Sequence, residues 1–362
     1  VFVYLRYGEG MDNLARQENL EQEIRPFLTE ISMLDDPALV SKRCHAFLYR
    51  FPPERGLEIA SLLTYANPFF LPEIPAESAR QIAADLELYA ETVMRAKLTA
   101  TRARQLNVLV ACAPKSAPTF IQDALCKALN LPVGGLSTAT MDATSGSMLG
   151  ANLKEQEPDE LALIRNGLNM RGYVAQHHAR CSPYLARLLS AYKVRPIITH
   201  RNILDTIVSM DDMVMEWRAP NAAASVYYFN DGMPGNFHTR DRDDRLMMLA
   251  QRWTAWLVQF YISWKKVEQM GLIKPVWVSY ETDFLGDKQL LAARISAHLG
   301  VDMAATARLA HAFEDRTDAG AKRLNKGVAG RGQDVPVKVR EQVLRIAGFY
   351  RDEQDITPLV GA

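Results

Sequence analysis

A short apolar run that leads into a tight loop and then a helical pattern constrains the fold of this chain most. Residues 106–112 are apolar except for Asn107, as expected for a strand covered on both faces of a parallel sheet. The loop Ala113–Thr119 follows, and residues 120–129 then have an amphipathic helical pattern. A strand, a loop and a helix N-terminus bring backbone N–H groups and the positive end of a helix dipole together. The sequence therefore predicts an α/β fold in which this loop can hold an anion.

Apolar runs and helical patterns continue to alternate toward the C-terminus. We expect further strands at residues 172–176, 194–199 and 275–280, and helices at residues 183–192, 203–216 and 245–270. Because strands that alternate with helices form βαβ units, this pattern predicts a doubly wound parallel sheet in a three-layer arrangement.

The N-terminal part has a different pattern. Across residues 12–105, apolar side chains recur every three or four positions, and prolines at 52–53 and within 67–72 separate the helical stretches. We therefore expect an all-α extension, residues 1–104, followed by the α/β domain, residues 105–362. The extension could complete a substrate pocket, mediate homo-oligomerisation or join this domain to a larger enzyme. Since the chain begins with Val1, we expect that upstream residues have been removed.

Charge and hydropathy exclude some classes of partner. The 362 residues include 42 Lys plus Arg and 42 Asp plus Glu, so the formal net charge is zero. A balanced charge gives no bulk attraction to nucleic acid or anionic lipid. The longest apolar stretches, such as residues 107–113, are much shorter than the roughly 20 residues of a membrane-spanning helix. We expect a cytoplasmic protein with no nucleic-acid partner and no membrane span.

The cysteines and histidines do not have metal-site spacing. Cys44, Cys112, Cys126 and Cys181 are scattered and form no C-x-x-C pair. The sequence also contains no H-E-x-x-H motif. We therefore expect reduced structural thiols and no bound metal.

Several aromatic and charged groups have simple structural interpretations. Helical spacing favours core packing for a set of aromatic residues: Trp253, Trp256, Phe260, Tyr261 and Trp264. We expect His200 to be a packing residue. The acidic pair Asp211–Asp212 and the charged run 241–245 are most simply solvated surface charge.

The loop after the first strand carries the first candidate site. Lys115 adds a cation there, and Ser116 and Thr119 add hydroxyl groups. The G-x-x-x-x-G-K-[ST] spacing of nucleoside triphosphatases is missing, so the loop need not hold a magnesium triphosphate. An ordinary turn with a solvent-facing lysine explains this string equally well.

A second candidate anchor follows the strand at residues 194–199. Arg201 lies at the expected carboxyl end of that strand, where ligands bind in such sheets. If a helix starts near Asn202, Asp205 and Ser209 fall one turn apart on one face. An arginine and a serine hydroxyl at this edge would suit a phosphate monoester.

These segments resemble the sulfotransferases that use 3′-phosphoadenosine 5′-phosphosulfate (PAPS). Residues 114–120, Pro-Lys-Ser-Ala-Pro-Thr-Phe, are similar to the family's Pro-Lys-Ser-Gly-Thr-Thr-Trp loop, and Arg201 and Ser209 keep the spacing of its 3′-phosphate motif. Residues 278–281 look like its strand ending in Tyr-Glu, and residues 325–331 like its late Arg-Lys-Gly-x-x-Gly loop. The resemblance covers roughly residues 105–360, and residues 1–104 match no pattern that we can name.

The resemblance implies a PAPS-binding site without a metal ion. The implied donor-binding residues are Lys115, Ser116, Ala117, Pro118, Thr119, Phe120, Arg201, Ser209, Tyr280, Lys326 and Gly327. The chain departs from the family at Ala117, Pro118 and Phe120, which replace Gly, Thr and Trp, and at Asn325, which replaces Arg. Arg331 is a nearby cation that could compensate.

The implied reaction is sulfuryl transfer to a hydroxyl or amine of a small-molecule, lipid or glycan acceptor, which leaves 3′-phosphoadenosine 5′-phosphate (PAP). Lys115 would stabilise the charge that grows on the leaving oxygen. In the family a base commonly ends the strand after the first loop, where this chain has His177 and His178. We prefer His178 because residues 176–179 overlay the family's Lys-x-His-hydrophobic pattern, with Gln in place of Lys. A pair of surface imidazoles remains the alternative.

The sequence leaves the acceptor and two rival functions open. Residues 219–244 form a long loop, and Tyr227, Tyr228, Phe229 and His238 make it a candidate acceptor lid or an ordinary solvent loop. A nucleotide kinase is one rival, although the Walker spacing is missing. A catalytically inactive nucleotide-binding or scaffold module is the other, because of Ala117, Pro118 and Asn325.

Overall fold

The structure is a computed structural model that describes residues 24–34, 36–52, 59–60, 63, 86–137, 154, 156, 158–216, 234, 236–315 and 327–361. The chain divides into two compact units: Val1–Arg95 with Ala139–Asn152, and Ala96–Thr138 with Leu153–Ala362. The sequence-based domain boundary at residue 104 stays a prediction.

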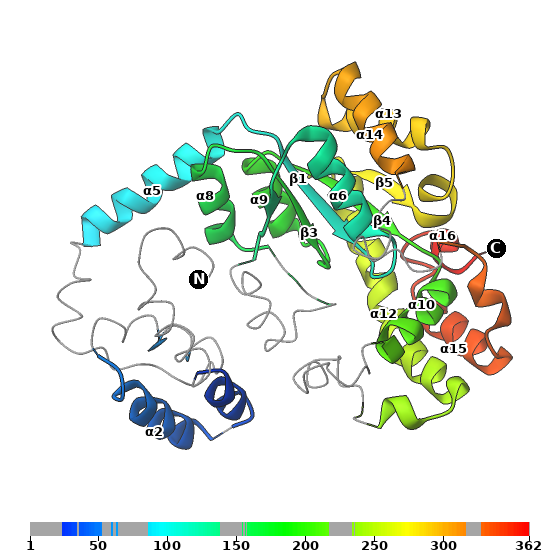
Figure 1. The fold of residues 1–362 in the computed structure, drawn as a ribbon, viewed down its shortest axis with the longest axis horizontal. Coiled ribbons are helices and arrows are strands. Elements are labelled where there is room, and N and C mark those ends of the chain that lie inside the picture. The colour runs from blue at the N-terminus through cyan, green and yellow to red at the C-terminus, as the bar shows by residue number, and fades with distance from the viewer. Residues whose placement is uncertain are drawn as a thin grey trace. The chain divides into compact units, whose positions relative to one another are not determined.

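A five-stranded, all-parallel sheet forms the centre of the second unit (Figure 1). Its strands, in the spatial order β2-β3-β1-β4-β5, are β2 (Val133–Gly134), β3 (Tyr173–His177), β1 (Asn107–Cys112), β4 (Val194–His200) and β5 (Val276–Ser279). β1 is central and buried at every position. The α/β fold expected from the apolar runs is confirmed.

Helices cover both faces of the sheet, so the unit has three layers. Alternate β1 residues face opposite ways: Val108 and Val110 belong to one buried cluster, and Leu109 and Ala111 belong to the other. The first face carries α6 (Pro118–Leu129), α13 (Lys288–Leu299) and α14 (Met303–Glu314). The second carries α8 (Glu160–Leu168), α9 (Pro183–Ala191), α10 (Ile203–Glu216), α12 (Arg242–Gln269), α15 (Val337–Gly348) and α16 (Thr357–Val360).

Local chemistry explains where these helices begin. The side chains of Asp159, Ser182, Asp241 and Asp302 cap α8, α9, α12 and α14 by accepting backbone N–H hydrogen bonds. α6 begins at Pro118, whose fixed φ angle suits the first helical position. The predicted strands and helices are confirmed with boundaries shifted by at most three residues, while β2, α8, α13, α14, α15 and α16 were not predicted.

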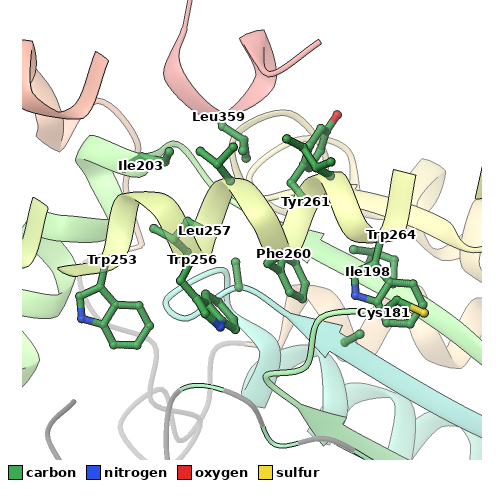
Figure 2. Close-up of a cluster of buried hydrophobic side chains, with 14 of the residues drawn as sticks. Cys181, Ile198, Ile203, Trp253, Trp256, Leu257, Phe260, Tyr261, Trp264 and Leu359 are labelled. Carbon is green, nitrogen blue, oxygen red and sulfur yellow. The ribbon is translucent and has the colours of Figure 1, made fainter. Parts of the chain in front are cut away.

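The aromatic residues of α12 pack in the core, as predicted (Figure 2). Trp256 stacks on Phe260 with ring centroids 5.4 Å apart. The indole N–H of Trp264 donates to the backbone oxygen of Ala179 at 3.0 Å, which ties α12 to the chain just after β3. This helix therefore supports the segment that carries the histidine pair.

The described part of the first unit contains helical residues 24–32, α2 (Pro37–Leu48) and the first part of α5 (Leu86–Arg102). Ile31, Val40 and Leu63 belong to its buried apolar cluster, and the rings of Phe27 and Phe47 stack 4.0 Å apart. These elements are helical, but many of residues 1–104 lie outside the described ranges, so the all-α extension stays a prediction.

Within the described ranges, no helix combines the length and apolar character needed to cross a membrane.

Candidate functional site

The loop between β1 and α6 has an unusual backbone. Lys115 and Ala117 have φ angles of +65° and +62°, in the left-handed region that side chains with a Cβ rarely adopt. Ala117 is also the N-cap of α6 and provides no side-chain cap for its first turn. Non-glycine residues in this region concentrate at ligand-binding sites, because the surrounding structure must hold them there. The loop is therefore a strained turn at a helix N-terminus.

Ser116 braces this loop from within. Its side chain is fully buried, and its Oγ lies 2.5 Å from the Ala113 oxygen and 2.6 Å from Thr199 Oγ1. The Ser116 hydroxyl proton goes to Ala113, so the Thr199 hydroxyl donates to Ser116. The backbone also joins the loop to β4, since Ala113 N–H donates to Thr199 O at 2.9 Å. Ser116 thus connects the first candidate segment to the strand that leads to the second.

Replacing Ala117 by glycine should stabilise the protein. Glycine adopts a φ of +62° without the Cβ penalty of about 1–2 kcal/mol, and part of that gain is offset by the greater freedom of unfolded glycine. We expect a net gain of about 0.5–1 kcal/mol, measured by urea unfolding. The control Ala124→Gly, inside α6 at an ordinary helical position, should destabilise by about 1 kcal/mol. Equal losses in both variants would contradict the strained-loop assignment.

The side chain of Arg201 contacts three other segments: the loop at residues 114–120, the turn after β5 and the segment at residues 327–332. Its guanidinium donates to Lys115 O at 3.1 Å and to Val328 O at 3.0 Å. The same group lies 4.0 Å from the ring centroid of Tyr280, at cation–π distance. Its Nη2 is 3.6 Å from Asp205 Oδ2, and the side chain is 4% exposed. The loop, α10, the end of β5 and the C-terminal segment therefore meet at one buried cation.

Among the described residues, three buried polar atoms within residues 201–209 lack hydrogen bonds: Arg201 Nε, Thr206 Oγ1 and Ser209 Oγ. A buried polar group without a partner costs roughly 1–3 kcal/mol, and a bound water or ion is one of the usual ways in which such a group is satisfied. Arg201 and Ser209 are the two residues for which the sequence predicted a phosphate contact.

Phe120 and Tyr280, two of the implied donor-binding residues, have side chains that lie in the core. Phe120 is 1% exposed and meets Phe284 edge to face at 5.3 Å. Tyr280 is 3% exposed, with Phe284 stacked at 5.3 Å on its ring and Arg201 near it. Both rings come from elements that adjoin the loop, α6 and the π-helical turn η4 (Tyr280–Phe284).

His177 is held at both ring nitrogens. Its Nε2 accepts the backbone N–H of Leu136 at 2.9 Å, so the proton is on Nδ1, which donates to Gln156 O at 3.0 Å. Burial, with a smaller contribution from the nearby His178, lowers its pKa to about 4. Both ring nitrogens of this neutral imidazole are therefore hydrogen-bonded, to Leu136 and to Gln156. The ring has a structural role and no free lone pair that could accept a proton from a substrate.

His178 has one nitrogen to spare. Its Nδ1 lies 2.9 Å from the Cys112 backbone oxygen and must carry the proton that it donates there. Its Nε2 makes no hydrogen bond to the part of the chain that the structure describes, and the residue is 6% exposed. Burial lowers its pKa to about 4, so the ring is neutral at pH 7. Geometry thus separates the two histidines that the sequence could not.

Other predicted residues take ordinary positions or lie outside the described ranges. Pro118 and Thr119 begin α6, and Gly327 has a φ of +66°. His200 is buried against Tyr261 and Trp277, as expected of a packing residue. The predictions for Tyr227, Tyr228, Phe229, Asn325 and Lys326 fall on residues outside the described ranges. His238 lies in the short 3-10 turn η3 (Phe237–Thr239).

The interpretation of the acidic residues as solvated charge was wrong for Asp211 and Asp212. Asp211 is 5% exposed and accepts two hydrogen bonds from Arg245, at 2.7 and 3.1 Å. Asp212 pairs with Arg331 at 2.7 Å, so this arginine is held by a carboxylate of α10. Asp241 is exposed and also caps α12, so the interpretation as surface charge holds for it. The sequence pattern could not show the partners of Asp211 and Asp212 because they lie 34 and 119 residues away.

Three contacts near the site had little or no signal in the sequence. Gln156 pairs with the chain after β3: its N–H donates to His178 O and its side-chain oxygen accepts the His178 N–H. Glu281 accepts the N–H of Asn202 at 3.0 Å. Asp205 accepts two backbone N–H groups of the C-terminal segment. Only Glu281 belonged to a recognised motif.

A separate cavity of about 470 Å³ lies between the segment just before α9, α12 and the turn after α15, lined in part by Arg180, Gln259 and Lys266. Arg180 donates to Gln259, and Lys266 pairs with Glu353. None of the sequence-predicted site residues lines it. Within the described ranges, no group of three His, Cys, Asp or Glu side chains is arranged to hold a metal ion.

Comparison with models of known protein families finds no match for this chain, and comparison with curated protein sequences finds none either. The case for a function therefore rests on the residues and geometry described above.

Proposed function

We propose that the second unit binds PAPS and transfers its sulfuryl group to a hydroxyl or amine of an acceptor. The observation that carries the proposal is the convergence on Arg201. Four segments, selected from the sequence for their resemblance to the sulfotransferase motifs, contact one another through this single guanidinium. Arg201 is separated along the chain from Lys115 by 86 residues and from Val328 by 127. Three of the segments follow the neighbouring strands β1, β4 and β5, whose carboxyl ends meet at the edge where ligands bind in such sheets, and the contact with Val328 adds the fourth.

The unsatisfied atoms fit an anion at this junction. A phosphate group can accept hydrogen bonds from an arginine and a serine hydroxyl, and Arg201 Nε and Ser209 Oγ need acceptors. The N-terminus of α6 lacks a side-chain cap and favours negative charge through its dipole. The donor residues carried over from the resemblance, Lys326 included, complete the proposed site.

In the proposed reaction, the bond between sulfur and the bridging phosphate oxygen breaks as a bond forms between sulfur and the acceptor. Negative charge grows on the bridging oxygen, where Lys115 and the α6 N-terminus would stabilise it. His178 Nε2 would take the acceptor's proton. An anionic sulfuryl group bound nearby would raise the pKa of His178 from about 4 toward the range that suits a base.

Replacing Ser209 by alanine tests the donor site with little risk to folding, since its hydroxyl has no partner to lose. We expect Ser209→Ala to weaken PAP binding about ten- to a hundredfold, the effect of one hydrogen bond to a charged group. Adenosine 5′-phosphate, which lacks the 3′-phosphate, should bind both proteins equally. Titration calorimetry with the two nucleotides measures both effects. A wild-type protein that does not prefer PAP over adenosine 5′-phosphate would refute the proposal.

A catalytically inactive nucleotide-binding module is the second candidate. It is favoured by the Ser116 hydroxyl, whose proton is already donated to Ala113, and by the buried Phe120 ring. Under this alternative PAP would bind with the same preference, but no PAP would form from PAPS with any acceptor. An assay of PAP release therefore separates the two candidates.

A further inference from the structure

A buried carboxylate holds the C-terminal segment against the start of α10. Asp205 Oδ2 accepts the N–H of Gly330 at 2.8 Å, and Oδ1 accepts the N–H of Gly332 at 2.6 Å. Arg201 adds a third contact by donating to Val328 O at 3.0 Å. The three contacts involve Val328, Gly330 and Gly332, so they hold the chain on both sides of the start of the 3-10 turn η5 (Arg331–Asp334). Asp205 is 3% exposed, which keeps water from competing for these bonds.

Two glycines allow residues 328–332 to lie close to the start of α10. Gly330 has a φ of +80°, and a Cβ on Gly332 would lie 2.5 Å from Leu204 Cβ and 3.0 Å from the Leu204 backbone carbon. Only glycine at 332 therefore lets the segment lie directly on α10. Asp205 and Gly332 act together. The Asp205 carboxylate accepts the two backbone N–H groups, and Gly332, which has no Cβ, allows the segment to come close enough to α10 for these bonds to form.

Asp205 also lies beside the cation of the proposed donor site, with Oδ2 3.6 Å from Arg201 Nη2. The Asp205 carboxylate attracts the Nη2 end of the Arg201 guanidinium, while Arg201 Nε remains without a hydrogen-bond partner among the described residues. The same carboxylate thus sets the position of the C-terminal segment and the orientation of Arg201.

We propose that Asp205 is a positioning residue for the nucleotide 3′-phosphate, which it does not itself contact. It would act by holding residues 327–332 and Arg201 together so that both face the same anion. This inference rests on the proposed function.

The test compares Asp205→Asn with two other variants of the full chain by calorimetry with PAP and adenosine 5′-phosphate. An asparagine keeps the shape but presents an N–H₂ group to one of the two backbone N–H donors, so one bond is lost. We expect its PAP dissociation constant to rise at least tenfold and that for adenosine 5′-phosphate to stay within twofold. Gly332→Ala displaces the segment while leaving Asp205 intact, and should have the same selective effect.

Asp211→Asn is the matched control. It removes a buried carboxylate of the same helix that pairs with Arg245 and does not contact residues 327–332. Its affinity for PAP should stay within twofold of wild type. Hydrogen exchange of the free protein gives a second measurement: at least one of the Gly330 and Gly332 amides should exchange at least tenfold faster in Asp205→Asn than in wild type, and neither should in Asp211→Asn.

The outcomes separate the two proposals. Wild-type PAP affinity in Asp205→Asn, or an equal loss in Asp211→Asn, overturns the positioning role while leaving the donor site in place. Should the wild type bind neither nucleotide, the proposed function fails, and the positioning role fails with it even if the amides exchange faster.

Discussion

Lowering the pH from 7 to 5 is expected to reduce the free energy of unfolding by about 5 kcal/mol. Burial lowers the pKa values of His177, His178 and His200 to about 4 in the folded protein, against 6.5 for an ordinary histidine. On acidification the unfolded chain therefore takes up protons before the folded protein does. The stabilisation is complete above pH 6.5 and is lost as the pH falls toward 4. Each histidine contributes about 2 kcal/mol between pH 7 and pH 5.

Urea unfolding at pH 7, 6 and 5 measures this dependence, and His200→Phe is the variant that tests its origin. His200 Nδ1 is buried without a hydrogen-bond partner among the described residues. The centroid of its ring lies 5.4 Å from that of Tyr261 and 6.0 Å from that of Trp277. Phenylalanine keeps the ring contacts and cannot titrate, so the variant should lose about one third of the pH dependence. A variant with the full wild-type dependence would show that His200 does not take part.

The main elements of the fold could be predicted because each has a strong local pattern. The run at residues 106–112 is buried on both faces as β1, and the strand patterns before His177 and Arg201 became β3 and β4. By contrast, β2 has only two residues, too few for any periodicity. The helices α13 and α14 follow good N-caps, Asp287 and Asp302, which were overlooked in the sequence.

The candidate site was predictable as a set of residue types but not as a set of contacts. Spacing along the chain selected Lys115, Arg201 and Ser209. It could not show that Ser116 uses its hydroxyl proton within the loop, since the acceptor depends on backbone geometry. It also could not assign the two histidines. Alternation in a strand says only that they point to opposite faces, whereas their roles depend on Leu136, Gln156 and Cys112, 21 to 66 residues away.

Asparagine substitutions at the two histidines should affect different properties: His178→Asn should lower the reaction rate, and His177→Asn should lower the stability. In His178→Asn, the side-chain amide can still donate to Cys112 O, as Nδ1 does, but the group at the position of Nε2 is lost. We expect the rate of PAP release from PAPS to fall by about 10²- to 10⁴-fold, the usual contribution of a general base, with stability nearly unchanged. PAP should still bind, since His178 is proposed to act on the acceptor.

His177→Asn removes Nε2, the ring nitrogen that accepts the backbone N–H of Leu136. The backbone N–H of Leu136 then loses its acceptor in a buried site, which costs about 1–3 kcal/mol of stability. The rate per folded molecule should stay within about tenfold of wild type, because neither ring nitrogen of His177 is available to an acceptor. For each of the two variants, urea unfolding measures the stability and PAP release measures the reaction rate. If His177→Asn loses the rate and His178→Asn keeps it, His177 is the base, and the hydrogen bonds of its ring must break when substrate binds.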